Sequence, residues 1–99
     1  MSFVVQENSK AKIITLISAL IPEAKIYLFG SRARGTNSEW SDIDLALDAG
    51  IPIPSLAIME LNDIMIATNL PYKVDIVDFH SISDIMREAI LKEKIVWKS

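Results

Sequence analysis

Apolar residues recur along this chain with two different periods, and the changes of period predict the order of its secondary structure. Three stretches carry apolar residues at helical spacing, and three shorter runs are rich in β-forming residues. The predicted helices begin at Asn8 or Ser9, at Ser55 and at Ser81, and end near Leu20, Thr68 and Glu93. The predicted strands span residues 26–29, 43–47 and 73–79, and a last apolar run at 95–97 is expected to dock on the sheet.

This order of elements predicts the fold class. A chain of 99 residues is one small domain, covering residues 1–99, because a chain of this length buries roughly 65% of its unfolded surface and supports a single core. Three strands are too few for a full doubly wound sheet. We therefore expect an α/β (α+β) domain with a small mixed β-sheet, helices packed mainly on one face, and the motif described below at an exposed edge.

The helix predicted from Ser55 has more apolar surface than a two-layer domain can bury. Its main apolar face opposes a second set of apolar residues, Leu56, Met59 and Ile66. Single apolar residues on a surface are common. However, the chain is 51% hydrophobic, which is high for so small a domain. An interface with another chain is the favoured interpretation, and a homo-oligomer is left open.

The charge and the remaining composition exclude several classes. The formal net charge is −3 and the basic residues are scattered, so direct binding to nucleic acid is not expected. There is no cysteine, hence no disulfide framework and no thiolate metal site. No apolar run approaches 18 residues, so no membrane span is expected and a cytoplasmic protein is the default.

Two acids open the second predicted strand. Residues two apart in a strand point to the same face, with Cα atoms roughly 6.5 Å apart, so the carboxylates of Asp42 and Asp44 can converge. A divalent cation would convert their repulsion into attraction, and ligands that are all oxygen favour Mg²⁺ or Mn²⁺. Taken alone, Ser-Asp-x-Asp is more often an ordinary turn entering a strand.

The turn after the first predicted strand has the residue types of a phosphate site. Gly30 lets a phosphate approach the backbone, and Ser31 carries a hydroxyl donor. Arg32 and Arg34 can neutralise phosphate charge, although alternate residues of a loop need not share a face, so which of them contacts phosphate stays open. Trp40 is expected to pack against this loop rather than to stack on a base.

The third predicted strand offers two further acids. Asp75 lies in the middle of the strand, where an unpaired carboxylate would be costly and a metal site would explain it. Asp78 lies at the end of the strand, where water can reach it easily. We therefore choose Asp75 as the third acid.

These motifs together resemble the minimal nucleotidyltransferases of the DNA polymerase β superfamily, of the short type paired with HEPN-domain partners in toxin–antitoxin modules. The resemblance rests on Gly30-Ser31, on Asp42-Ile43-Asp44 and on Asp75, and extends loosely over almost the whole chain. It implies the polymerase β-like fold, with Asp42, Asp44 and Asp75 as catalytic metal ligands for two Mg²⁺ ions.

The resemblance also implies an activity. Members of this type look like antitoxins that move AMP from ATP to a tyrosine of a HEPN ribonuclease toxin, so a nucleotide triphosphate and a HEPN-domain protein are the expected partners. A non-catalytic module that neutralises its partner by covering it is the rival interpretation. A small antibiotic-modifying nucleotidyltransferase is a third, and is disfavoured because the chain lacks a substrate-binding domain.

Overall fold

A computed structural model describes residues 5–99, with four helices and four strands in that part of the chain. Of the apolar residues at the start of the chain, Phe3 and Val4 lie outside the described residues, and Val5 is buried. In chain order the elements are α1 (Glu7–Leu20), β1 (Lys25–Phe29), α2 (Ser31–Arg34), β2 (Ile43–Asp48), α3 (Ser55–Ala67), β3 (Val74–Asp78), α4 (Asp84–Glu93) and β4 (Ile95–Lys98).

The four strands form one mixed sheet in the order β3-β2-β1-β4. β1 pairs antiparallel with β2 and with β4, whereas β2 and β3 are parallel and are connected through α3. The mixed sheet is as predicted. The apolar tail at 95–97 also docks on the sheet as expected, and it does so as an edge strand that pairs with β1.

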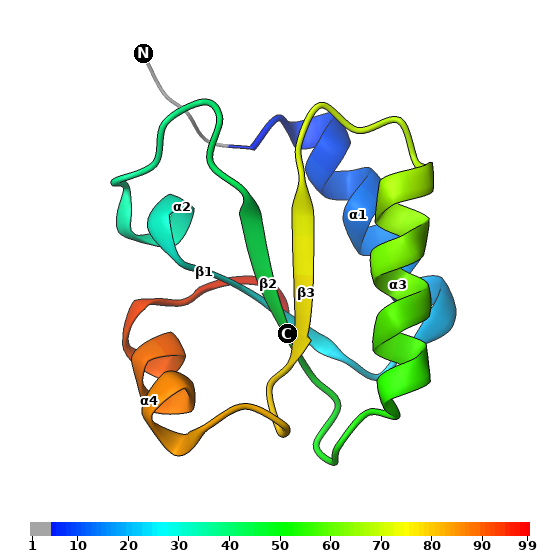
Figure 1. Ribbon diagram of the computed structural model, residues 1–99, viewed down its shortest axis with the longest axis vertical. Helices are drawn as coiled ribbons and strands as arrows, with labels where there is room; N and C mark the ends of the chain where they lie inside the picture. Colours follow the sequence, from blue (N-terminus) through cyan, green and yellow to red (C-terminus); the bar gives the residue numbers. More distant parts are fainter. Residues whose placement is uncertain (1–4) are drawn as a thin grey trace.

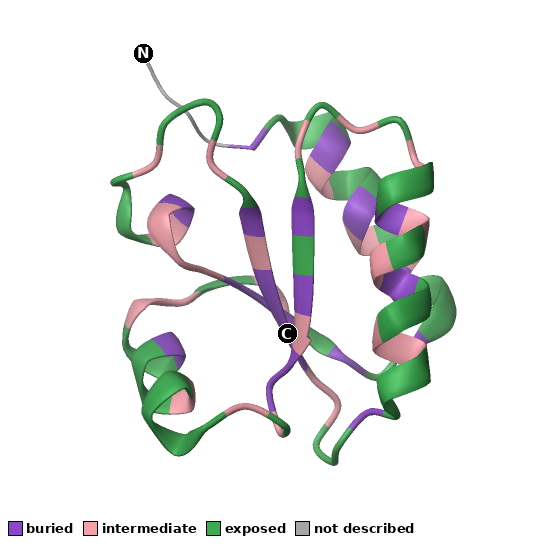
Figure 2. Ribbon diagram, in the orientation of Figure 1, coloured by how far each residue is buried: buried purple, intermediate pink, exposed green. Residues whose placement is uncertain are grey.

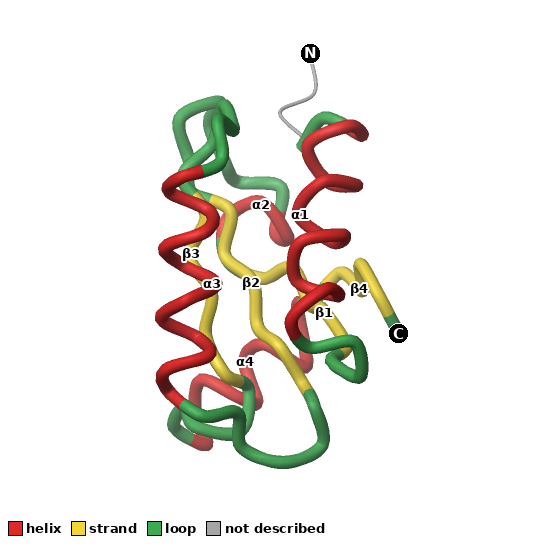
Figure 3. Tube along the Cα trace, turned by 90° about the vertical axis from the view of Figure 1, so that its right-hand side faces the viewer, coloured by secondary structure: helices red, strands yellow, loops and turns green. Residues whose placement is uncertain are grey.

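The helices cover the two faces of this sheet unequally (Figures 1 and 3). α1 and α3 lie on one face and enclose the main core, which includes Ile13, Ile17, Ile26, Leu45 and Leu61, each fully buried. α2 and α4 lie on the other side, where the core is small and is built around Tyr27, Ala46, Phe79 and Ile90. This second face is therefore only partly covered, and we call it the open face.

The last helix differs from its prediction. α4 begins at Asp84 because Ser83 caps it, its Oγ accepting the N–H of Met86 at 3.2 Å. Ser81, the predicted start, instead donates its hydroxyl to Asp78 at 2.6 Å. The apolar residues at helical spacing in this helix are mostly not buried: Ile85 is 84% exposed, whereas Ile90 is buried. One short helix over a narrow part of the sheet has room to bury little more than Ile90 and the stem of Arg87.

The edge strand β3 is held in place by a side chain from α3. Asn62 donates from Nδ2 to the carbonyl of Ile76 at 3.1 Å, and its Oδ1 accepts the N–H of Ile76 at 3.0 Å. The amide thus replaces a neighbouring strand and blocks that stretch of the edge against pairing with another chain. None of the helices formed by residues 5–99 is long and apolar enough to cross a membrane.

Candidate active site

The acids of the motif are brought together on the open face by strand register. Asp44 lies opposite Asp75 in the parallel β2–β3 pair and opposite Phe29 in the β1–β2 pair. Neighbours of Asp44 along the strand, Ile43 and Leu45, point into the main core and are fully buried. Alternation therefore directs Asp44 to the opposite face. Asp42, two residues earlier, is exposed just before β2 begins.

The carboxylate of Asp44 is in an unfavourable environment for a charge. Desolvation raises the pKa of Asp44 above its usual value, and repulsion by Asp75 and by Asp42 raises it further, while the guanidinium of Arg34 acts in the opposite direction. The charges of Asp75 and Asp42 thus both act on the carboxylate of Asp44. Within residues 5–99, however, no three acidic or histidine side chains enclose a point closely enough to hold a metal ion as they stand.

Gly30 is required by two features of the turn between β1 and α2. Its φ of 78° and ψ of −156° define a conformation that residues with a side chain rarely adopt. A Cβ placed on Gly30 would also lie 2.5 Å from Oδ2 of Asp44. The missing side chain thus lets the backbone of Gly30 and the carboxylate of Asp44 approach one another closely.

Ser31 and Arg34 begin and end the short helix α2. The hydroxyl of Ser31 makes no hydrogen bond with any residue in the described range 5–99, so it keeps its donor for a ligand. Arg34 is half exposed and pairs with Glu93 of α4, from Nη1 to Oε2 at 3.1 Å. The same guanidinium lies close enough to Asp44 to affect its pKa. Glu93 is a neighbour of the site that the sequence analysis did not identify.

Arg32 is directed away from this cluster. Its side chain is 7% exposed, and it donates from Nε and Nη2 to the carbonyl of Ser41 at 3.1 and 2.8 Å. The guanidinium carbon lies 5.0 Å from the ring centre of Tyr72. These contacts fasten the loop that leads into Asp42. The two arginines, between which the sequence left the choice open, therefore have different environments, and Arg34 is the one beside the acids.

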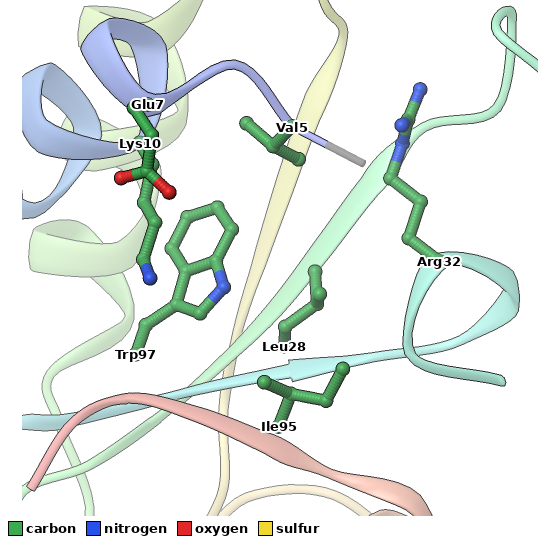
Figure 4. Close-up of a pocket in the computed structure, with 7 residues that line it drawn as sticks. All are labelled: Val5, Glu7, Lys10, Leu28, Arg32, Ile95 and Trp97. Atoms are coloured by element: carbon green, nitrogen blue, oxygen red, sulfur yellow. The ribbon is translucent and has the colours of Figure 1, made fainter. Parts of the chain in front are cut away.

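A hollow lies beside Arg32, and the residues that line it are drawn in Figure 4. It measures about 250 Å³ and is lined on one side by Glu7, Lys10 and Trp97, and its lining includes none of Asp42, Asp44 and Asp75. Lys10 there lies 5.6 Å from the ring centre of Trp97. Trp40, which was expected to pack against the motif loop, is instead 85% exposed, so that expectation is wrong.

The third strand reverses the environments expected for its two acids. Asp78 was predicted to be solvated but is 5% exposed, and it accepts hydrogen bonds from the N–H of Ile53 at 2.8 Å and the hydroxyl of Ser81 at 2.6 Å. Asp75 was predicted to be costly to bury but is exposed, because β3 is an edge strand with an uncovered face. The reasoning from burial was wrong, whereas the register with Asp44 independently favours Asp75.

Known proteins are similar in sequence to this chain over most of its length. The sequence model of the family described as polymerase beta, nucleotidyltransferase, matches residues 11–99. Protein adenylyltransferase MntA of Shewanella oneidensis is 36% identical over 94 residues, which cover 93% of this chain and 67% of that protein.

Solved structures are similar over most of the chain as well. One, described as a toxin–antitoxin with AMP-PNP, matches with a TM-score of 0.76 and 35% identity over 89% of this chain and 71% of the other. A second is the tri-AMPylated Shewanella oneidensis HEPN toxin in complex with its MNT antitoxin. It matches with a TM-score of 0.73 and 31% identity over 94% of this chain and 71% of the other.

Proposed function

This chain belongs to the polymerase β nucleotidyltransferase family, and we propose that it moves AMP from ATP to a hydroxyl group of a partner protein. Family and fold are as the sequence motifs predicted, and the chain is a nucleotidyltransferase. The observation that carries the proposal is the register of Asp44 against Asp75, on an open face and beside a glycine turn. Paired carboxylates beside a glycine turn suit metal-assisted nucleotidyl transfer.

The residues present suit divalent cations. Asp42, Asp44 and Asp75 offer oxygen ligands without sulfur or nitrogen, which favours Mg²⁺ or Mn²⁺. Desolvation, and then the charges of Asp75 and Asp42, raise the pKa of Asp44, and bound cations would offset this unfavourable environment. Asp42 and Asp75 are exposed, so their side chains can turn toward Asp44. Two bound ions would neutralise the triphosphate and stabilise the leaving pyrophosphate.

The chain's own donors then orient the nucleotide. Ser31 offers a hydroxyl to a phosphate oxygen, and Gly30, which has no side chain, lets the turn lie directly beside the Asp44 carboxylate. Arg34 supplies a positive charge on the same side as the acids. Arg32 acts indirectly, by holding the loop that carries Asp42 through its bonds to Ser41.

In the transfer itself, the acceptor oxygen forms a bond to the α-phosphorus of ATP. The bond between that phosphorus and the bridging oxygen of the β-phosphate breaks, and pyrophosphate leaves with the bonding electrons. The acceptor hydroxyl loses its proton, and we assign Asp75 as the base that accepts it. Asp75 is exposed on the edge strand, where an incoming protein can reach it.

We further propose that the acceptor is a tyrosine of a HEPN toxin and that the chain acts as its antitoxin. The MntA adenylyltransferase and the complex with a tri-AMPylated HEPN toxin support this assignment. The partner would also explain the outer side of α3, where Leu56, Met59 and Ile66 are 70%, 58% and 81% exposed (Figure 2). The interface predicted from the sequence therefore stays a prediction, now with a defined surface.

The test is transfer of label from ATP labelled at the α-phosphate, with Mg²⁺ and the HEPN partner, comparing wild type with Asp44→Ala. Label on the partner with wild type and not with Asp44→Ala would support the enzyme. An unlabelled partner that binds wild type and Asp44→Ala equally tightly would instead support a non-catalytic module, which the exposed face of α3 also permits. Replacing the partner tyrosine with phenylalanine should abolish labelling if the acceptor is correct.

A further inference from the structure

Glu93, the last residue of α4, reaches across to the turn that follows β1. Its Oε1 accepts the N–H of Gly30 at 3.1 Å, and its two carboxylate oxygens lie 3.3 and 3.1 Å from Nη1 of Arg34. The Glu93 side chain is 22% exposed, against 51% for that of Arg34. One carboxylate therefore holds two donors that belong to the proposed phosphate site.

The register of the sheet explains how Glu93 arrives there. β1 and β4 are antiparallel with Leu28 opposite Ile95, and continuing that register by two residues places Gly30 opposite Glu93. α4 ends at this residue, and the next, Lys94, has the backbone of a helix cap rather than of a strand. The Glu93 side chain thus takes over as acceptor for the Gly30 amide at the point where the β-ladder stops.

Helix energetics do not account for a glutamate at this position. An acid in the last turn of a helix faces the negative end of the helix dipole, which disfavours it. The favourable basic residue of that turn is Lys92, one position earlier. A residue that breaks a local rule is often kept for contacts elsewhere, and here the contacts are to Gly30 and Arg34.

We propose that Glu93 is a positioning residue for the nucleotide, a proposal that rests on the proposed function. A guanidinium has five N–H donors. Glu93 is bonded to Nη1 of Arg34, so the other donors of that arginine can face a phosphate. An exposed arginine loses much rotamer freedom when it binds a ligand, and a side chain that is already held loses less. Glu93 also fixes the peptide of Gly30, which the neighbouring hydroxyl of Ser31 follows.

Because Glu93 is negatively charged, a charge effect and a positioning effect predict opposite changes in nucleotide affinity when it is removed. Removing a carboxylate beside a site for a polyanion should tighten nucleotide binding if charge alone mattered. Positioning predicts the opposite, since Arg34 and the Gly30 amide would no longer be held.

The experiment compares Glu93→Ala and Glu93→Gln with the control Glu88→Ala, an exposed acid on the same helix. Binding is measured by calorimetry with Mg²⁺ and an ATP analogue that has a methylene between the α- and β-phosphates, so that no transfer occurs. We expect Kd to rise about 3- to 10-fold in Glu93→Ala, the range set by losing an ordered side chain. Glu93→Gln, which keeps an acceptor for Gly30, should recover part of the loss, and Glu88→Ala should match wild type.

Steady-state transfer provides a second readout, with KM for ATP rising more than kcat falls. A structural defect would instead lower the fraction of active protein and leave Kd unchanged. Unchanged or tighter binding in both Glu93 variants, with wild type binding normally, would overturn the positioning role while leaving the proposed function intact. If wild type itself bound no nucleotide in the presence of Mg²⁺, the proposed function and this inference would fall together.

Discussion

Asp44 and Asp48 share one strand and one face, four residues apart, and yet have opposite electrostatic environments. Asp44 faces Asp75 and Asp42, and desolvation together with these charges raises its pKa. Burial alone would also raise the pKa of Asp48, but hydrogen bonds from His80, Gly50 and Tyr27 outweigh it, and the pKa is lowered.

The partners of Asp48 show how this protein treats an acid that serves the fold. Nε2 of His80 lies 2.7 Å from Oδ1, the N–H of Gly50 donates to the same oxygen at 2.9 Å, and the hydroxyl of Tyr27 donates to Oδ2 at 3.1 Å. Asp44 faces two like charges instead. One end of β2 is thus stabilised by contacts within the chain, whereas the other end is where we propose that a cation and a phosphate bind.

The largest expected contrast is in activity. Asp44→Asn should lower AMP transfer at least about a hundredfold, because a metal ligand contributes several kcal/mol of charge stabilisation. Asp48→Asn should change the rate less than about threefold, because its contacts are at the other end of the strand. Initial rates of label transfer measure both variants, and comparable losses in the two would show that the site assignment is wrong.

The stability gained on nucleotide binding should likewise depend on Asp44 and not on Asp48. With Mg²⁺ and the non-transferable ATP analogue at about 100 times Kd, mass action adds about 2.7 kcal/mol to the free energy of unfolding. We expect this gain in wild type and in Asp48→Asn, and little of it in Asp44→Asn. Urea unfolding with and without ligand measures the difference, and a full gain in Asp44→Asn would place the nucleotide elsewhere.

Period-two alternation was enough to place Asp44 on a face away from the core, and the distance along the chain allowed a helix before Asp75. The choice between Asp75 and Asp78 could not be derived in the same way, since a strand reads alike whether it is central or at an edge. Asp78 accepts hydrogen bonds from Ile53 and Ser81, and both of these residues lie in loops whose positions depend on the whole fold.

Local sequence also could not separate Arg32 from Arg34. A helix of four residues has no apolar stripe from which its orientation could be read, and the carbonyl of Ser41 and the ring of Tyr72 decide where Arg32 points. Glu93 was missed because its partner Gly30 is 63 positions away. The one local signal was an acid at a helix C-terminus, which conflicts with the dipole.

Without nucleotide, the order of the two positions should reverse, and substitution of Asp48 should have the larger effect on the free energy of unfolding. Asp48→Ala should lower the free energy of unfolding by about 2 kcal/mol, because it removes an acceptor shared by three donors, one of them the buried Tyr27. Asp44→Ala should leave stability unchanged or raise it by less than about 1 kcal/mol, since it relieves desolvation and repulsion at a partly buried site that solvent still screens. Urea denaturation near pH 7 without Mg²⁺ compares them, and a greater loss in Asp44→Ala would contradict the division between the two ends of β2.

The smallest effect is the pH dependence, and here the two acids should differ in sign. The pKa of Asp48 is lowered in the folded protein. Its contribution to the free energy of unfolding is therefore present above the ordinary aspartate pKa of about 3.9 and is lost as pH falls through the folded pKa. The pKa of Asp44 is raised, so its contribution is present below about 3.9 and is lost as pH rises through the folded value. Relative to wild type, Asp48→Asn should therefore be less stable at pH 6 and approach it toward pH 3, whereas Asp44→Asn should be more stable at pH 6 and approach it toward pH 3.

Each of these differences should be about 1 kcal/mol or less, because solvent screens both sites in part. Urea unfolding of the three proteins at half-unit steps between pH 3 and pH 6, without Mg²⁺, resolves them as two curves that diverge from the wild type in opposite directions. Adding Mg²⁺ at pH 6 should remove the advantage of Asp44→Asn, because a cation held by the wild-type acids replaces repulsion with attraction, and should leave the deficit of Asp48→Asn in place. Curves that diverge in the same direction would mean that Asp44 is an ordinary paired acid of the fold, and that the open end of β2 is not arranged for a cation.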